Sequence, residues 1–315
     1  MTYHMRADLS RVRTISVRSR RSMVRVEGFA RPFDGAGGTF AAFARSLPRF
    51  LAARDLHTLV EDIRRARRTR KPVLVLMGAH VVKVGLNPVL VDLLRRRIIT
   101  AVAMNSAAAI HDVETALWGR TSEDVAAGLR TGRFGMARET AEFINSTLRE
   151  AVATDLGYGE ALGMRLLAER APRADRSILA VCCRLRVPLT VHAAIGTDTI
   201  HQQPSMDGAA TGEMTFRDFR SLAHTCGGLT GGGVVLNIGS AVILPEVFLK
   251  ALTVARNLGS PARGFTTAVF DMLQHYRPHM NVQARPTQDG GRGFYFTGHH
   301  EIMIPLLAAM ITARR

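Results

Sequence analysis

Two stretches of the chain decide its fold. Residues 73–83 read V-L-V-L-M-G-A-H-V-V-K, and residues 100–112 read T-A-V-A-M-N-S-A-A-A-I-H-D. In each, an apolar run of strand length (73–77 and 100–104) ends at small or polar residues, and a helical pattern separates the two runs. Two strands joined by a crossover helix form a right-handed βαβ unit. Because ligands of open α/β sheets bind beyond the carboxyl ends of the strands, the pair predicts both a fold and a site.

The second half of the chain repeats this pattern. Further strands are predicted over 189–193, 234–237, 264–270 and 293–297, and helices over 112–117, 122–129, 137–156, 160–170, 177–184, 216–226, 245–258 and 302–313. We expect Thr121 or Ser122 to cap the second of these helices. The glycine cluster 227–233 precedes its strand, whereas a dinucleotide fingerprint follows one, so it is interpreted as a flexible loop. Strands alternating with helices predict an α/β fold, with a mainly parallel sheet covered on both faces.

The N-terminal part differs in composition from the rest. Residues 1–25 contain seven arginines and one aspartate, and we expect them to form a basic, disordered extension. Residues 39–70 carry apolar residues at helical spacing up to a basic run over 64–71. The predicted organisation is therefore an extension (1–25), a helical N-terminal region (26–70) and an α/β domain (71–315), for which the family resemblance given below implies cofactor binding and catalysis.

Composition narrows the function classes. The formal net charge is +16, but only three of the 42 basic residues are lysine, a skew that suggests coding bias. Direct nucleic-acid binding is therefore not expected, although a basic surface would permit it. Three cysteines, two of them adjacent, predict neither a disulfide framework nor a cysteine zinc site, which favours the cytoplasm. No apolar run approaches the roughly 20 residues of a membrane span.

From about residue 70 to 313, the chain resembles the deoxyhypusine synthase family in the order and spacing of its strands. The motifs that carry the resemblance are 78–85, 105–112, Gly196-Thr197-Asp198, the strand 234–239 and the closing strand with its Pro305-Leu306-Leu307 helix. The resemblance implies a Rossmann-like, NAD-dependent enzyme that acts on an amine or polyamine. It also implies a homotetramer with its sites at dimer interfaces.

One departure from the family limits this analogy. The family forms an imine on a lysine shortly before its last strand, and residues 278–293 contain no lysine. Arginine cannot replace it, because the guanidinium stays protonated and is a poor nucleophile. We therefore expect a small amine, polyamine or hydroxylated substrate rather than true deoxyhypusine synthesis.

Four residues near the first two strand ends are candidates for catalysis. Histidine titrates near neutral pH, so His80 and His111 with Asp112 would suit proton transfer during hydride removal. Lys83 is the candidate amine nucleophile, if burial near His80 lowers its pKa. The alternatives are a core histidine for His80 and a carboxylate or phosphate partner for Lys83. His192, beside its own apolar strand, is interpreted more readily as a core histidine.

A second set of residues is predicted to bind NAD. These residues follow strand ends or occupy the family's motif positions: Gly78, Ala79, Asn105, Ser106, Ala107, Asp198, Gly239, Ser240, Asp271 and His299. A carboxylate in a loop after a strand, such as Asp198, can bind a ribose hydroxyl or a substrate amine, or can simply cap a helix. Gly239 and Ser240 either admit a phosphate at the start of the next helix or make a tight turn.

Three function classes stay open at this point. The first is an NAD-dependent enzyme, for which no bound metal is predicted. The second is a metal-dependent hydrolase or lyase that uses histidine and aspartate ligands, drawn from His80, His111, Asp112, His192, Asp198 and His201. The third is a non-catalytic relative that kept the ligand pocket.

Overall fold

A sheet of six strands forms the centre of the molecule. The computed structural model describes residues 4–313, and within them the strands are β1 (Val73–Met77), β2 (Ala101–Asn105), β3 (Leu189–His192), β4 (Val234–Ile238), β5 (Thr266–Asp271) and β6 (Arg292–Thr297). Their order is β3-β2-β1-β4-β5-β6, and each neighbouring pair is parallel. The predicted α/β fold with a parallel sheet is confirmed.

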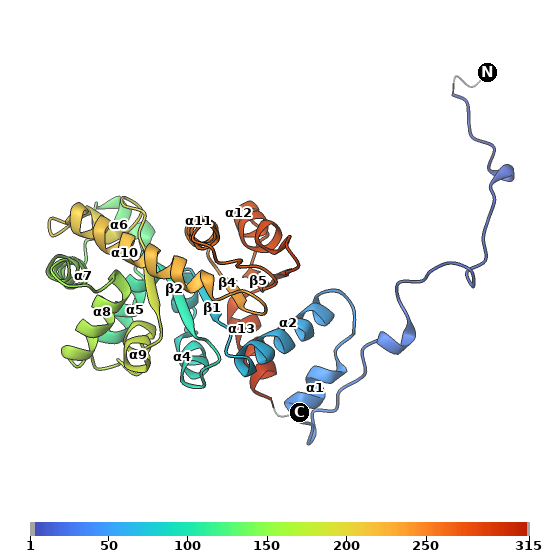
Figure 1. The fold of residues 1–315 in the computed structure, drawn as a ribbon, viewed down its shortest axis with the longest axis horizontal. Helices are drawn as coiled ribbons and strands as arrows, with labels where there is room; N and C mark the ends of the chain where they lie inside the picture. Colours follow the sequence, from blue (N-terminus) through green and yellow to red (C-terminus); the bar gives the residue numbers. More distant parts are fainter. Residues whose placement is uncertain (1–3, 314–315) are drawn as a thin grey trace.

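Helices connect successive strands and enclose the sheet (Figure 1). They are α1 (Phe40–Ser46), α2 (Leu51–Arg68), α3 (His80–Lys83), α4 (Asn87–Arg95), α5 (Ser106–Trp118), α6 (Val125–Arg130), α7 (Arg138–Ala151), α8 (Tyr158–Ala168), α9 (Ile178–Leu185), α10 (Gly208–Gly227), α11 (Ile243–Asn257), α12 (Tyr276–Pro278) and α13 (His300–Thr312). Short 3-10 turns cover Leu9–Arg11, Val26–Gly28, Thr199–Gln202 and Arg285–Thr287, and a π-helical turn covers His279–Ala284. None of the helices in residues 4–313 is both long and apolar enough to cross a membrane.

Strand side chains alternate between two cores, one on each face of the sheet. Val73, Val75 and Met77 pack with apolar residues of α2, α4, α5, α8, α9 and α13. Leu74 and Leu76 point the other way and pack against α10 and α11. All five residues of β1 are buried, as the near-continuous apolar runs of a doubly covered parallel sheet require. Each such aliphatic side chain contributes about 1.5–3 kcal/mol through its burial.

The N-terminal segment extends away from this body (Figure 1). Residues 4–27 are exposed throughout. The chain first contacts the body where the ring edge of Phe29 meets Phe50, with the ring centroids 6.3 Å apart, and where Arg49 N–H donates to the Gly28 carbonyl. Helix α2 belongs to the predicted N-terminal region, but its buried face lies in the same core as the sheet.

Several helix boundaries differ from the predicted ones for local reasons. The helix expected over 39–70 is split at residues 47–50, where Pro48 lies between α1 and α2, because proline lacks an N–H and restricts the residue before it. The side chain of Asp124, not of Thr121 or Ser122, caps α6 by accepting the Ala127 N–H. Helix α10 begins at Gly208, eight residues before the predicted start at Phe216, because Asp207 caps it there.

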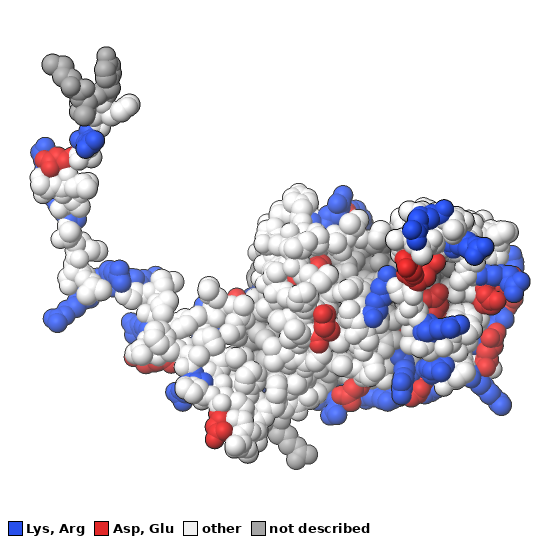
Figure 2. All heavy atoms as spheres, turned by 180° about the vertical axis from the view of Figure 1, so that it is seen from behind, with Lys and Arg blue, Asp and Glu red and all other residues white. Residues whose placement is uncertain are grey.

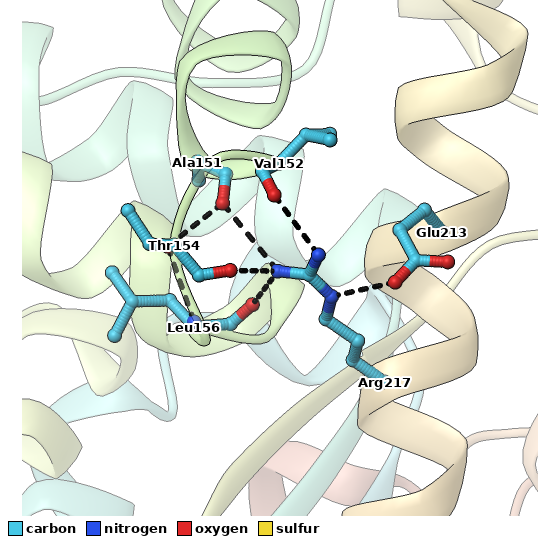
Figure 3. Close-up of polar contacts among 6 residues, drawn as sticks. All are labelled: Ala151, Val152, Thr154, Leu156, Glu213 and Arg217. Atoms are coloured by element: carbon cyan, nitrogen blue, oxygen red, sulfur yellow. Dashed lines mark hydrogen bonds and ion pairs between the residues drawn. The ribbon is translucent and has the colours of Figure 1, made fainter.

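One arginine ties α10 to the end of α7. The guanidinium of Arg217 donates to the carbonyls of Ala151, Val152 and Leu156 at 3.5, 3.0 and 3.1 Å. It also reaches the carbonyl of Thr154, and its Nε donates to Glu213 (Figure 3). These bonds satisfy carbonyls at a helix end that have no partner within the helix.

Candidate functional site

The carboxyl ends of the six strands meet at one edge of the sheet. The strand order reverses between β1 and β4, and open α/β sheets bind ligands in the crevice at such a switch point. Two glycines face each other there. A Cβ on Gly78 would lie 2.1 Å from the Gly239 carbonyl oxygen, and Gly239 has a left-handed backbone with φ of 64°. Both positions therefore require glycine, which lets two backbones approach closely.

Backbone donors are available beside this crevice. The amides of Gly78 and Gly239 are used, since they donate to the carbonyls of Ile238 and Phe270. The amides of Ser240 and Ala241, which precede α11, have no acceptor within residues 4–313. The buried Ser240 hydroxyl accepts the Leu244 N–H and so fixes the first turn of α11. The turn at Gly239 and Ser240 thus presents free N–H groups at the start of a 15-residue helix.

Two imidazoles lie at the same crevice. The ring centroids of His80 and His300 are 5.4 Å apart. His300 is buried, and its Nε2–H donates to the Phe270 carbonyl at 3.1 Å, which leaves Nδ1 as a buried acceptor without a partner in the described chain. Burial lowers the pKa of His80, and the neighbouring His300 lowers it further. A neutral His80 at pH 7 can act as a proton acceptor.

The structure brings together two predicted site residues that are far apart in the sequence. Ser106 begins α5 after β2, and its hydroxyl donates to the Asp198 carboxylate, which follows β3. Asp198 also caps the short helix Thr199–Gln202. The capping interpretation of Asp198 is therefore confirmed, and its role in binding a ligand stays a prediction. The carboxylate lies half-buried at the strand ends.

Two further polar groups surround Asp198. The Nδ1 atom of His201 accepts the N–H groups of Gly196 and Asp198, both at 3.1 Å, so Nε2 carries the proton. This Nε2 atom and the hydroxyl of the fully buried Tyr158 have no hydrogen-bond partner in residues 4–313. Burial lowers the pKa of His201 and raises that of Tyr158. Buried donors without partners are uncommon and indicate space for a ligand or an ordered water.

His111 and Asp112 are adjacent in sequence but occupy different surroundings. Nδ1 of His111 lies 2.6 Å from the Thr121 hydroxyl, which in turn donates to Glu114. Burial alone would raise the pKa of Glu114, but hydrogen bonds from His111, Thr121 and Thr140 lower it overall. Since the Thr121 hydroxyl donates to Glu114, His111 donates through Nδ1, which leaves its Nε2 as an acceptor.

Asp112 lies away from solvent at the start of α9. It is fully buried and accepts hydrogen bonds from the Asn87 side chain, the Ser177 hydroxyl and the N–H groups of Ile178 and Leu179, at 2.6–3.0 Å. Burial raises the pKa of Asp112, and these bonds oppose the rise. All its described contacts join α4, α5 and α9, and none involves His80.

The other predicted residues vary in accessibility. Lys83 ends α3, is exposed, and has no carboxylate within ion-pair distance in the described chain, so the burial that its role as a nucleophile presumed is not present. His192 is buried, with its Nε2 3.0 Å from the Thr190 hydroxyl, and burial lowers its pKa to about 3. It therefore occupies the position of a core histidine.

The remaining cofactor candidates lie at or near their strand ends. Asn105 caps α5 by accepting the Ala108 N–H at 2.9 Å, and Ala107 is half-buried in the first turn of that helix. Asp271 ends β5, is buried, and accepts the Met272 N–H at 2.8 Å. Ala79 precedes α3, and the exposed His299 precedes α13. The structure thus brings Gly78, Gly239, Ser240 and His80 to one crevice, and places Ser106 with Asp198 beyond β2 and β3.

The metal-dependent alternative requires a group of ligand side chains. Within the described residues, no three histidine, cysteine, aspartate or glutamate side chains are grouped so that they could hold a metal ion. The ligands that the metal-dependent alternative required are separated, since Asp112 is enclosed by donors and His192 is paired with Thr190.

His300 and Tyr158 were not among the predicted site residues. His300 directly follows the predicted His299, but only the fold shows that its ring lies against Gly239. No sequence signal distinguishes Tyr158 from an ordinary core tyrosine, because its position beside Asp198 depends on the packing of α8 under β3.

The chain is similar to known proteins in structure but not in sequence. No model of a known protein family matches the chain, and no curated protein matches it by sequence. The structure of ArgZ, an arginine dihydrolase from the ornithine-ammonia cycle in cyanobacteria, is similar with a TM-score of 0.51 and 16% identity over 84% of this chain and 33% of that one. AgrE in a ternary complex with ornithine and NAD+ is similar with a TM-score of 0.54 and 14% identity over 82% of this chain and 32% of that one. The chain thus spans about a third of the length of these two proteins.

Two more distant structures extend the comparison. A candidate LOR/SDH protein of Methanococcus maripaludis S2 matches with a TM-score of 0.50 and 15% identity, over 88% of this chain and 71% of that one. A candidate deoxyhypusine synthase from Entamoeba histolytica matches with a TM-score of 0.49 and 9% identity, over 89% of this chain and 96% of that one. This likeness is too distant to bear on function. At these identities the comparisons show the fold alone: the chain has the α/β architecture found in ArgZ, in NAD+-bound AgrE and in the LOR/SDH protein.

Proposed function

We propose that this chain binds NAD at the β1/β4 crevice and uses it to oxidise a small amine or amino acid. The observation that supports this best is the crevice itself: Gly78 and Gly239 meet at the switch point of a sheet whose strand order matches that of dinucleotide-binding folds. The complex of AgrE with ornithine and NAD+ supports both the cofactor and an amine substrate.

The residues present fit the proposed cofactor. The free amides of Ser240 and Ala241 at the start of α11 would bind phosphate oxygens. No carboxylate ends β2, where dinucleotide-binding folds often hold a ribose hydroxyl. Asp198 would supply it from the neighbouring loop, because Ser106 holds its carboxylate beside the end of β2. Bound NAD would supply the hydride acceptor.

The protein's own side chains would handle the protons and the substrate charge. His80, neutral at pH 7, is the proposed acceptor of the proton released from the amine. His300, whose unpartnered Nδ1 also accepts, lies 5.4 Å away between ring centroids and is the second candidate. His111 and Lys83 stay candidates for positioning the substrate, with Lys83 exposed enough to meet an anionic group. A homo-oligomer, tetrameric by resemblance, also stays a proposal, as does a location in the cytoplasm.

The test begins with protein purified without added ligand. Native mass spectrometry would detect retained NAD, and a fluorescence titration with NADH would measure affinity for wild type, His80→Gln and Asp198→Asn. We expect micromolar binding, weakened in Asp198→Asn and kept in His80→Gln. Turnover would then be screened as NADH formation with L-ornithine, L-arginine and spermidine, and His80→Gln should lower kcat by about 100-fold.

The outcomes separate the function classes. No NADH binding at millimolar concentration would overturn the proposal. Tight binding without turnover on any amine or alcohol would replace the enzyme with the non-catalytic ligand-binding alternative. Equal activity of His80→Gln and wild type would remove His80 as the proton acceptor and transfer that role to His300.

A further inference from the structure

A basic groove lies at the opposite edge of the sheet from the crevice. It has a volume of about 680 Å³ and is formed where the chain enters β1, β2 and β3. Its cationic lining residues are Arg67, Arg70, Lys71 and Arg97, and no aspartate or glutamate lines it. The groove contains half of the basic run 64–71 that the sequence displays. None of these residues contributes to the proposed NAD site.

The four cations lack a partner in the part of the chain that the structure describes. None of them forms an ion pair or a side-chain hydrogen bond within residues 4–313, and three of the four are exposed. Other arginines of this chain behave differently at helix ends. Arg217 donates to four carbonyls in and just after the last turn of α7 (Figure 3), and Arg64 donates to three at the end of α13. The groove arginines therefore do not serve as helix caps of this kind.

Two of these arginines occupy backbone positions that normally belong to glycine. Arg70 and Arg97 have φ of 54° and 55°. In both cases the helix ends in a Schellman motif. After α2, the Arg70 N–H donates to the Arg67 carbonyl and the next N–H donates to the Ala66 carbonyl. After α4, the Arg97 N–H donates to the Leu94 carbonyl and the next N–H donates to the Leu93 carbonyl. Glycine is preferred at this left-handed position because a Cβ is disfavoured there. Both positions thus bring an arginine to the lining of the groove. Arg170 and Arg186 occupy the same kind of position elsewhere in the chain, so the four cations together, and not the backbone strain, define the groove.

The charge and size of the groove define its ligand. Four unpaired cations in one concavity repel one another, and an anion with several oxygens would relieve this repulsion. Arginine matches phosphate oxygens well because its planar guanidinium can donate two parallel bonds. Arg67 and Arg70 lie at the end of α2 and Arg97 follows α4, so we expect a ligand with several linked phosphates to meet both sets better than a single phosphate does. A groove of about 680 Å³ suits a compact anion better than the long basic track that nucleic acid requires. On the face that Figure 2 draws, basic side chains are interspersed with acidic ones.

We propose that this groove binds a compact polyanion with two or more linked phosphates, such as the phosphate chain of a nucleotide or inorganic triphosphate. Arg70 and Arg97 provide the principal contacts, with Arg67 and Lys71 beside them. The site is separate from the crevice and does not depend on the proposed redox function.

Glycine substitution gives a test in which stability and binding respond differently. Arg70→Gly and Arg97→Gly relieve the left-handed backbone, so the melting temperature should stay unchanged or rise by about 2 °C. The double variant should bind inorganic triphosphate at least tenfold more weakly by isothermal titration at about 50 mM salt, and raising the salt to about 0.5 M should weaken wild-type binding. Arg170→Gly is the matched control, because Arg170 occupies the same Schellman position after α8, with φ of 54°, but does not line the groove.

The probes distinguish the source of the phosphates. ATP binding as tightly as triphosphate indicates recognition of the phosphate chain, and tighter ATP binding adds a nucleoside contact; both support the proposal. Triphosphate binding that is unchanged in the double variant, or lost equally in Arg170→Gly, would overturn it. A 20-nucleotide RNA that binds through Arg70 and Arg97 and is not displaced by triphosphate would also overturn it. Asp198→Asn should leave triphosphate binding intact, so failure of the NAD proposal would not affect this result.

Discussion

At the scale of single residues, Asp198 combines a structural contact with a position near the site. It caps the helix Thr199–Gln202, accepts the Ser106 hydroxyl, and lies near two buried donors that have no partner in the described chain, His201 Nε2 and the Tyr158 hydroxyl. Capping needs only an acceptor, whereas binding a ribose hydroxyl or an ammonium group favours a full negative charge. Changes that keep the acceptor and remove the charge can therefore separate the two roles.

Asp198→Asn should keep the cap and weaken ligand binding. We expect NADH affinity to fall about tenfold, which corresponds to about 1.4 kcal/mol for a lost charged hydrogen bond. Ser106→Ala should have a smaller effect, because the carboxylate stays and only its orientation is loosened. Fluorescence titration gives the affinities, and thermal denaturation checks that both variants fold. Unaltered NADH affinity in Asp198→Asn would assign this residue to capping alone.

His192 gives the fold a dependence on pH. Its folded pKa is about 3, below the ordinary value of 6.5, because burial disfavours the charged ring. Between these values the unfolded chain binds a proton that the folded chain does not, so stability is full above pH 6.5 and falls as the pH is lowered toward 3. The contribution approaches about 1.4 kcal/mol per pH unit.

His192→Gln should remove this slope. Urea unfolding at pH 7, 5 and 4 gives the free energy of unfolding of both proteins. We expect this free energy to fall more steeply with decreasing pH in the wild type than in the variant. Burial raises the pKa of Asp218 to about 7. The stability that Asp218 contributes is therefore full below the pKa of this carboxyl in the unfolded chain, and it is lost as the pH rises toward 7. This opposing slope is common to both proteins and cancels in the difference. Parallel curves for the two proteins would show that His192 is not buried as a neutral ring.

The sequence predicted where several site residues lie, and their roles stay predictions. The sequence placed Ser106 after one strand and Asp198 after another, and parallel pairing of β2 with β3 brings them together. The different fates of His111 and Asp112 were not predictable, because successive helix residues point about 100° apart and only the packing of α9 encloses Asp112.

At the scale of elements, Asp112 acts as an anchor for α9. Its carboxylate accepts two N–H groups from the first turn of that helix and two side-chain donors from Asn87 and Ser177. A carboxylate at a helix N-terminus is also favoured by the helix dipole.

Asp112→Asn should destabilise the fold by about 3 kcal/mol, because an amide group would place a donor against donors in a buried site. Chemical denaturation measures the loss, and His111→Ala, at the adjacent half-buried position, is the control that should cost less. A folded Asp112→Asn protein that has normal stability but no turnover would instead support the catalytic role first expected for this residue.

Arg217 fixes the end of α7 from a neighbouring helix. Arg217→Ala would leave the carbonyls of Ala151, Val152, Thr154 and Leu156 without this donor. We expect a loss of about 2 kcal/mol and faster hydrogen exchange confined to residues near 151–156. Arg220→Ala, an exposed arginine on the same helix, is the matched control. Equal hydrogen-exchange rates near residues 151–156 in the two variants would show that the hydrogen bonds of Arg217 add no local stability.

Strands were predicted more closely than helix ends. Apolar runs define buried strands directly, so β1 has the predicted bounds. Helix ends depend on which side chain caps them, and the pattern did not distinguish Asp124 from Thr121. The short turns over 276–287 lack apolar periodicity, and their position comes from contacts such as Asn281 with Glu246.

At the scale of the whole molecule, alternation predicted the class of fold, but not the strand order. The order became visible only from pairing, because β1 has β2 on one side and β4 on the other. The location of the crevice follows from that order, and this is why the sequence pointed to strand ends in general rather than to Gly78 against Gly239.

Removing residues 1–25 should leave the folded body intact. Residues 4–25 are exposed, whereas the contacts of Gly28 and Phe29 begin just beyond the cut. We expect the melting temperature to change by less than about 1 °C, since surface changes away from packed groups usually have small effects. Differential scanning calorimetry of the two forms measures this. A large decrease would show that the segment packs on the body or on a second copy.

The pairing of β1 with β4 also has a consequence during synthesis. Val73 pairs with Val234, so the ribosome makes β1, β2 and β3 long before the strand that covers the other edge of β1. At about 5–20 residues per second, that apolar edge waits on the order of ten seconds or more. Unpaired strand edges promote aggregation. Expression of this chain should therefore respond to chaperone supply and to slower translation more than its final stability would suggest.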